Sequence, residues 1–145
     1  MQGLQIDRIT DDHDLDQAYQ LRRTVFMDEQ GVSEEAEFDG LDDQCEHLLA
    51  KIGGRAVGSL RIRPIDDKIA KIERVVVLKS ERGRQIGANL MKAALEQVCE
   101  LGLRTVRLHA QTQAISFYAK LGFVAYGDIF DEDGIPHIAM QNDVV

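Results

Sequence analysis

The sequence predicts an α/β layered domain in which helices pack on a mixed β-sheet. Helix-like and strand-like periodicities alternate along its 145 residues, which is the first observation behind this prediction. The second is a run of consecutive β-branched residues, typical of a strand that is covered on both faces. The third is that no repeat, low-complexity tract or linker interrupts the chain. We therefore expect one domain over residues 1–145.

The first predicted elements are a helix and a β-hairpin. Apolar residues recur at helical spacing across residues 14–30. Arg22 falls within this apolar stripe, where its charge either extends to solvent or faces an anion in a cleft. Two strand-like runs follow at residues 45–52 and 56–63, and the pair of glycines between them is a hairpin signal.

A central strand then leads into the clearest helix. Residues 69–78 contain the run VVVL at 75–78, which predicts a strand buried in the middle of the sheet. Residues 85–101 carry a continuous helical stripe, and Gly102 follows as a stop signal.

The last elements complete the sheet. Residues 105–110 alternate apolar and polar side chains, residues 114–121 form a short helical pattern, and strands at 123–130 and 135–142 form a closing hairpin. An edge strand of this hairpin could pair with a second copy as a homodimer, although its acidic residues could equally prevent pairing.

Composition and charge exclude several classes of partner. Acidic residues outnumber basic residues by 25 to 17, so the net charge of −8 disfavours nucleic acid. No segment resembles a signal peptide or reaches 18 uninterrupted apolar residues. The two cysteines lie far apart, which favours free thiols over a disulfide or a zinc site. We expect a cytoplasmic protein that binds no nucleic acid, membrane or metal.

Acidic residues are concentrated between residues 28 and 46, where nine occur without a Lys or Arg. Such a run is either a solvated loop or an attractive rim for a cationic substrate.

The loop between the central strand and the clearest helix predicts a phosphate-bearing ligand. A glycine-containing loop at a helix N-terminus leaves backbone N–H groups free, and the helix dipole favours an anion there. Lys79, Arg82 and Arg84 stand against Glu81 alone, which makes the loop locally positive. The P-loop and dinucleotide-binding glycine patterns are both absent, so the loop is either a site for a polyphosphate-bearing ligand of another kind, which these residues favour, or a turn without a ligand.

The sequence resembles the GNAT superfamily of acetyl-CoA-dependent N-acetyltransferases over essentially its whole length. The motifs in question are VVVL at residues 75–78, RGRQIGA at 82–88 and AISFYAKLGF at 114–123. The segments HAQ at 109–111 and GIPHIAM at 134–140 are similar to the ElaA-like subgroup. The resemblance implies a GNAT fold: a single, mostly antiparallel mixed sheet, helices on both faces and a splayed central strand pair.

The resemblance also implies a binding site for acetyl-CoA. The family pattern R-x-x-G-x-G/A falls on Arg82, Gln85 and Gly87, so Gln85 replaces the usual glycine. We expect this replacement to be tolerated if the residue adopts a right-handed helical conformation; otherwise coenzyme affinity suffers. The residues implied in coenzyme binding are Val75, Val77, Arg82, Arg84, Gln85, Ile86, Gly87, Ala88 and Tyr118.

Tyr118 matches the family's general acid, which protonates the departing thiolate. Helical spacing alone favours simple packing of this ring with Phe117, and it is the resemblance that favours the catalytic role. For the base, the ending of the chain is similar to small-amine acetyltransferases that use a histidine, which favours His137, with Glu73 acting through water as the second candidate. His109, His47 and proton transfer to solvent remain open.

Recognition of the acceptor is assigned to Arg22, Arg74, Gln111 and His137. If both arginines face the cleft, the acceptor carries a carboxylate or phosphate beside its amine. If they pair with Glu73 or Asp39, they are structural, and the acidic run then favours a polyamine-like acceptor.

Three functions follow from these residues. The leading hypothesis is an N-acetyltransferase that acetylates the primary amine of a small molecule by direct attack in a ternary complex. The alternative is an acyl-CoA-binding module without transferase activity, which needs no base. Protein acetylation is the third, although no peptide-binding feature is visible.

Overall fold

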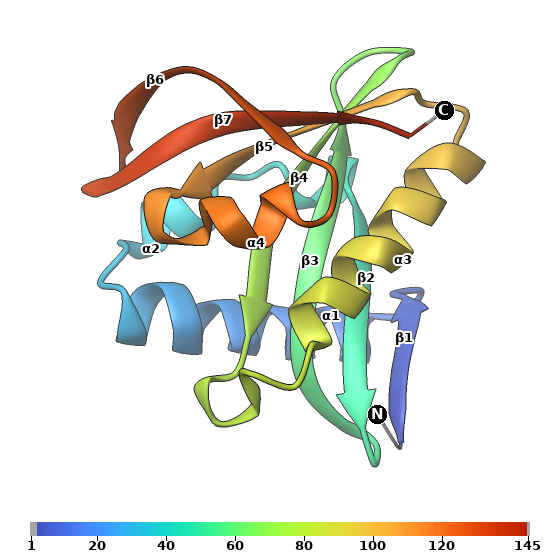
Figure 1. The fold of residues 1–145 in the computed structure, drawn as a ribbon. Coiled ribbons are helices and arrows are strands. Elements are labelled where there is room, and N and C mark those ends of the chain that lie inside the picture. The colour runs from blue at the N-terminus through green and yellow to red at the C-terminus, as the bar shows by residue number, and fades with distance from the viewer. Residues whose placement is uncertain (1–2, 145) are drawn as a thin grey trace.

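The computed structural model describes residues 3–144 and has one seven-stranded sheet with helices on both faces (Figure 1). The strands are Leu4–Arg8 (β1), Glu46–Ile52 (β2), Arg55–Pro64 (β3), Ile69–Val77 (β4), Thr105–Gln111 (β5), Val124–Glu132 (β6) and Ile135–Asp143 (β7). The α-helices are Asp12–Arg22 (α1), Glu34–Glu37 (α2), Ile86–Glu100 (α3) and Ile115–Ala119 (α4). Short 3-10 turns are Asp42–Gln44 (η2), Lys79–Glu81 (η3) and Thr112–Ala114 (η4), and a π-helix spans Arg23–Glu29 (η1).

The strand order is β1-β2-β3-β4-β5-β7-β6, which puts β4 in the middle. All neighbouring strands run antiparallel except β4 and β5, which are parallel. The predicted mixed, mostly antiparallel sheet is therefore confirmed.

Two elements at the N-terminal end differ from the prediction. The strand β1 was not expected. It is a five-residue edge strand that runs antiparallel to β2, and it is too short for an alternation of apolar and polar residues to be recognised in the sequence. The predicted helix over residues 14–30 is α1 continued by the π-helix η1. π-helical turns occur frequently at functional sites, and this one ends beside the cavity described below.

The central strands separate from each other. The ladder between β4 and β5 covers only Ile69–Lys71 against residues 105–107, and beyond it the two strands no longer pair. On its other side β4 has a bulge against β3, with Arg74 at a φ of 60°. The splayed pair that the resemblance implies is thus present.

Two hydrophobic cores hold the layers together. The larger lies between the sheet and α3, with Leu90, Met91 and Val98 fully buried against β2 to β5. The smaller lies on the opposite face, where α1 packs Ala18 and Leu21 against the sheet. None of the helices within residues 3–144 is both long and apolar enough to cross a bilayer.

Candidate active site

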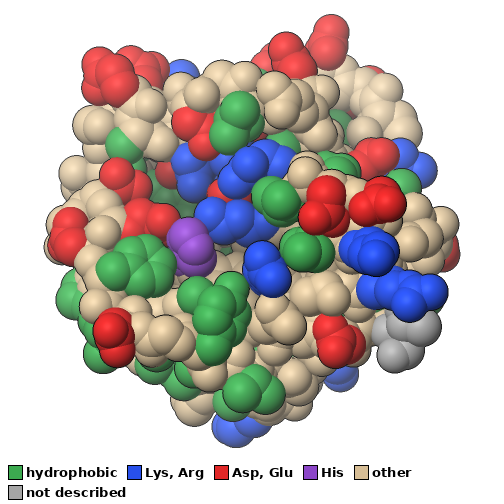
Figure 2. Space-filling view, turned by 90° about the horizontal axis from the view of Figure 1, so that it is seen from above, with side chains coloured by type: hydrophobic (Ala, Val, Ile, Leu, Met, Phe, Trp, Pro, Cys, Tyr) green, Lys and Arg blue, Asp and Glu red, His purple; other side chains and the backbone are tan. Residues whose placement is uncertain are grey.

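A cavity of about 890 Å³ opens where β4 and β5 separate. Its walls come from β4, the loop after it, the start of α3, the end of β5, α4, η1 and the β6–β7 turn. Figure 2 shows a hollow on this side of the molecule in which Lys and Arg side chains gather, with acidic side chains around them. The predicted site residues that line the cavity are Glu73, Arg74, Val75, Val77, Arg82, Gln85, Ile86, Gly87, Ala88, Gln111, Tyr118 and His137.

One end of the cavity presents backbone donors. The N–H groups of Ile86, Gly87 and Ala88 open α3, and within residues 3–144 they donate to no acceptor. The helix is 15 residues long, so its dipole adds positive potential at this point. Free donors at a helix N-terminus are suited to a phosphate group.

Both predicted basic residues of this loop are held in ion pairs. Arg82 makes a bidentate contact with Glu29 at 2.6 and 2.9 Å and donates to the carbonyl of Val77. Arg84 contacts Glu81 at 2.6 Å and does not line the cavity. To contact a bound phosphate, Arg82 would have to leave Glu29, or Arg84 would have to leave Glu81.

The backbone at Gln85 contradicts the expected right-handed conformation. Gln85 has φ 64° and ψ 20°, which is left-handed, and its side chain makes no capping hydrogen bond. This region costs an L-residue with a β-carbon roughly 1–2 kcal/mol, which explains why glycine is the usual residue here in the family that the sequence resembles. The chain adopts the turn anyway because the loop and α3 fix both flanks.

Replacing Gln85 with glycine is therefore expected to raise the free energy of unfolding by about 1 kcal/mol and the Tm by a few degrees. Urea and thermal melts measure this. A matched control is Gln20→Gly on the exposed face of right-handed α1, which is expected to lower the Tm. A decrease for both variants would show that the turn is not strained.

Tyr118 lies on α4 and points into the cavity. Its ring contacts Phe117 and Phe123 edge to face at 4.9 and 6.0 Å between centroids. Burial raises the pKa of Tyr118 to about 12, so the phenol keeps its proton at neutral pH. The residue is only partly buried, no buried side-chain oxygen within residues 3–144 lacks a hydrogen-bond partner, and the phenol is therefore accessible from the cavity that it lines.

A carboxylate and two histidines lie together on the opposite wall. His137 donates from Nδ1 to the carbonyl of Ile135 at 2.7 Å, so the lone pair of the neutral ring is on Nε2. That Nε2 lies 3.5 Å from Glu132, and Glu132 also accepts from Nδ1 of His109 at 2.9 Å. The bond from His109 lowers the pKa of Glu132, which stays ionised. A proton accepted at Nε2 would thus face a carboxylate.

Glu132 is the site residue that sequence reasoning missed. It falls in the segment DEDG at residues 131–134. The composition of this segment indicates a turn and gives no sign of a role in the site. The pairing of Phe130 with His137 in the hairpin is what brings Glu132 beside the two imidazoles.

Glu73, the second candidate base, is surrounded by cations. Arg61, Arg63 and Lys71 all lie within 3.2 Å of its carboxylate oxygens. These contacts outweigh burial and lower the pKa of Glu73 to about 2. A carboxylate of this kind is a weak base.

Arg22 does not reach the cavity, which corrects its assignment to the acceptor site. The side chain is buried and donates to Glu37 and Asp42 at 2.7 Å each. Arg74 lines the cavity but is also tied down, contacting Glu37 at 3.1 Å and Asp39 at 3.3 Å. Arg74 thus has the structural pairing with Asp39 that the sequence left open, whereas the partners of Arg22 are Glu37 and Asp42 and not the expected Glu73 or Asp39.

The acidic run between residues 28 and 46 is consequently not a mere solvated loop. Its members Glu37, Asp39 and Asp42 surround the buried guanidiniums of Arg22 and Arg61. The charges of these three residues are neutralised by ion pairs within the protein, so they are not available to attract a cationic substrate.

The π-helix η1 connects the two sides of the cavity. Glu29, its last residue, holds Arg82 of the loop after β4. The next residue, Gln30, accepts from Gln111 at the end of β5 at 2.9 Å. Gln111 therefore lines the cavity as expected, with its amide engaged by η1.

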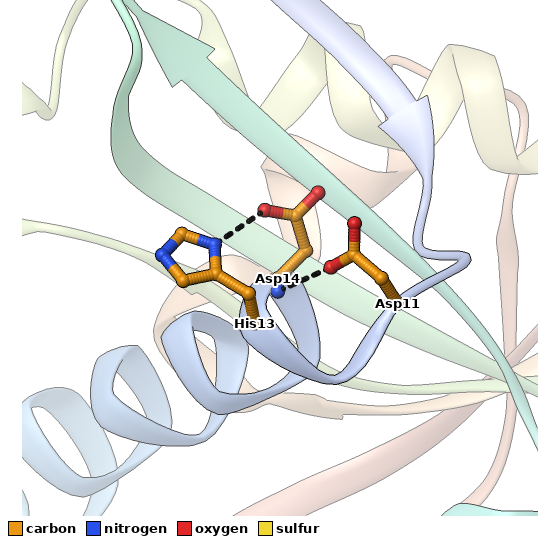
Figure 3. A group of neighbouring side chains, drawn as sticks. All are labelled: Asp11, His13 and Asp14. Atoms are coloured by element: carbon orange, nitrogen blue, oxygen red, sulfur yellow. Dashed lines mark hydrogen bonds and ion pairs between the residues drawn. The ribbon is translucent and has the colours of Figure 1, made fainter.

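A separate cluster of Asp11, His13 and Asp14 lies at the start of α1 (Figure 3). Asp11 caps the helix by accepting from the N–H of Asp14 at 2.8 Å. Asp14 pairs with Lys51 at 2.9 Å. These contacts explain the cluster as a helix cap.

The sequence matches the family described as "Acetyltransferase (GNAT) domain" over residues 10–144. It is 42% identical over 144 residues to the uncharacterized protein YyaT of Bacillus subtilis (strain 168), an alignment that covers 97% of each chain.

Solved structures agree with this match. The crystal structure of Escherichia coli ElaA superposes with a TM-score of 0.86 at 30% identity, covering 96% of this chain and 99% of that one. An acyl-CoA N-acyltransferase from Pseudomonas aeruginosa superposes with a TM-score of 0.85 at 32% identity and the same coverage.

Proposed function

The chain belongs to the GNAT acetyltransferase family, and we propose that it transfers the acetyl group of acetyl-CoA to the primary amine of a small molecule by direct attack in a ternary complex. Family membership confirms the resemblance drawn from the sequence, including its ElaA-like character. One observation carries the proposal: a single cavity contains a helix N-terminus with free N–H groups, a partly buried phenol and an imidazole.

The residues present fit an acyl-CoA. The free N–H groups at the start of α3 suit its pyrophosphate, with Arg82 beside them. Beyond Lys71, the edge of β4 that faces β5 is unpaired, so Val75 and Val77 can hydrogen-bond an extended pantetheine arm. The name of the Pseudomonas relative, acyl-CoA N-acyltransferase, supports the same co-substrate.

The chemistry requires two proton movements. The amine nitrogen forms a bond to the thioester carbon while the carbon–sulfur bond breaks, and the amine loses a proton. Tyr118 donates its phenolic proton to the departing thiolate, since its hydroxyl is protonated and accessible from the cavity. His137 accepts the amine's proton at Nε2, because this nitrogen carries the lone pair. Glu132 then faces the imidazolium.

This base assignment places His137 ahead of Glu73, whose pKa of about 2 makes it a poor acceptor near neutrality. A pH profile of kcat/KM tests it. Activity should fall at low pH in the native protein, and this fall should disappear in His137→Gln. A profile that is unchanged in that variant would remove the assignment.

Acetyl-CoA is expected to stabilise the protein. At about 100 times its Kd a ligand adds roughly 2.7 kcal/mol, which raises the Tm of a chain of this length by several degrees. A thermal-shift titration measures this, with AMP and acetate as controls. Thiol release from acetyl-CoA across a panel of primary amines then tests transfer.

The outcomes separate the candidate functions. A saturable shift with amine-dependent thiol release supports the small-molecule acetyltransferase. A shift without thiol release, either with amines or with peptide lysines, supports the binding module instead. The absence of any shift would contradict both. The single domain spanning residues 1–145, its cytoplasmic location and its homodimer stay predictions.

A further inference from the structure

Three basic residues lie directly opposite one another on adjacent strands beside the cavity. Arg63 of β3 pairs in register with Lys71 of β4, and Lys71 pairs with Arg107 of β5. Like charges in opposing positions destabilise a sheet unless negative charge lies close to them. The row therefore requires a counter-charge.

The protein supplies this charge only in part. Glu73 contacts Arg63 at 2.8 Å and Lys71 at 3.2 Å, but it also contacts the buried Arg61 at 3.0 Å. One carboxylate is thus shared by three cations. Within residues 3–144 no other carboxylate lies within 4.0 Å of the row, and Arg107 donates to the neutral amide of Gln141.

The excess positive charge is directed at the cavity by Lys71. This residue lines the cavity, whereas its strand neighbours Arg63 and Arg107 do not. Its side chain is 18% exposed and lines the cavity, so a ligand can reach it without unfolding the sheet. Figure 2 shows the resulting gathering of basic side chains in the hollow.

The same part of the cavity has an opposite pole. Glu132 and His137 line it from the β6–β7 hairpin, and Lys71 is close enough to Glu132 to lower its pKa. A cationic group and a carboxylate–imidazole pair therefore lie near each other in one space. An acceptor whose amine and acidic group are close together would meet both.

We propose that Lys71 is the centre of an anion subsite that binds a carboxylate or phosphate group of the acceptor, so that the acceptor is a small zwitterion of the amino-acid type. This inference rests on the proposed function, because it names the acceptor class of the same transfer. The amine then lies on the side of Glu132 and His137, where its proton is removed, and the acidic group lies on the side of Lys71.

Matched acceptors test the subsite. Amino acids are compared with their own amides, and O-phosphoethanolamine with ethanolamine, with kcat/KM measured by thiol release. We expect each acidic acceptor of the preferred type to exceed its neutral counterpart by about tenfold, as a charge-assisted hydrogen bond provides. The first pair reports on carboxylate and the second on phosphate.

Variants connect this preference to Lys71. Lys71→Gln should reduce the ratio of acidic to neutral acceptor about tenfold, mainly through KM, and Lys71→Arg should restore most of it. Lys92→Gln, on the exposed face of α3 outside the cavity, should leave the ratio unchanged. Thermal melts establish that each variant is folded.

A binding measurement makes the test independent of turnover. Calorimetric titration of the CoA-bound protein with an amino acid and with its amide reports the subsite even if no amine is acetylated. Lys71-dependent binding without turnover would overturn the proposed function and support the subsite. Turnover that prefers neutral amines, or a preference unaffected by Lys71→Gln, would overturn the subsite and leave the transferase standing. Absence of acid-dependent binding also overturns the subsite.

Discussion

Tyr118→Phe is expected to lower kcat by about 10²-fold or more while leaving the Tm almost unchanged. General acid catalysis by a positioned side chain contributes roughly 10² to 10⁴ to a rate. The variant removes one oxygen from a partly buried ring that lines the cavity, so folding loses little. The aromatic contacts with Phe117 and Phe123 are retained.

The prediction separates catalysis from packing. If Tyr118 served only to fill space between α4 and the sheet, phenylalanine would serve equally well and kcat would match that of the wild type. The matched control is Tyr126→Phe, because Tyr126 is exposed on β6 and lies outside the cavity. Steady-state thiol release with a saturating acceptor gives kcat, and the thermal shift by acetyl-CoA shows whether coenzyme binding is retained. Wild-type kcat in Tyr118→Phe would remove the general-acid assignment.

The sheet and its central strand were predictable because burial imposes a pattern on sequence. A β-branched run at residues 75–77 fits a central strand, and the stripe on residues 85–101 fits the helix that covers it. The five-residue β1 was missed since an edge strand of this length carries too few positions for its alternation to be recognised.

The site was predictable only where backbone geometry follows from local sequence. The loop before α3 is such a case. The conformation of Gln85 was not predictable. Left-handed backbone is typical of glycine, whereas here a residue with a side chain adopts it at the start of α3. Glu132 was missed for a related reason: its role depends on strand register, which sets it beside His137.

The ion-pair partners of the arginines were likewise not predictable from the sequence. Arg22 in an apolar stripe was correctly identified as unusual, and an acidic run was noted six residues later, at residues 28–46. Nothing in either pattern shows that they pair, because ion-pair partners are chosen by tertiary packing. The structure joins them: Glu37 and Asp42 come from the run and hold Arg22.

Arg61→Met is expected to lower the free energy of unfolding by about 3–5 kcal/mol at neutral pH, and the Tm by roughly 10–20 °C. Arg61 is fully buried and contacts Asp39, Asp42 and Glu73 at 2.8 to 3.0 Å. Removing it leaves three carboxylates close together with less counter-charge. Methionine fills much of the space, so the loss comes mainly from the unpaired charges.

The pH dependence identifies the cause. In the wild type, ion pairing lowers the pKa of Asp39 below its usual range and that of Glu73 to about 2. A carboxyl whose pKa is lower in the folded state adds stability that is complete above its unfolded pKa of about 4 and is lost as the pH falls toward the folded value. Wild-type stability should therefore fall between about pH 5 and pH 2. Without Arg61 this dependence weakens, because the carboxylates lose the cation that held their pKa values down.

The difference between wild type and variant should thus be largest near pH 7 and narrow as the pH falls from 5 to 2. Urea unfolding at several pH values measures it, and Arg104→Met, an exposed arginine on the loop before β5, controls for loss of a positive charge. A gap that stays constant with pH would mean that Arg61 stabilises by packing alone. A gap that closes would show that ion pairing with Arg61 is what fixes Asp39 and Asp42 of the acidic run.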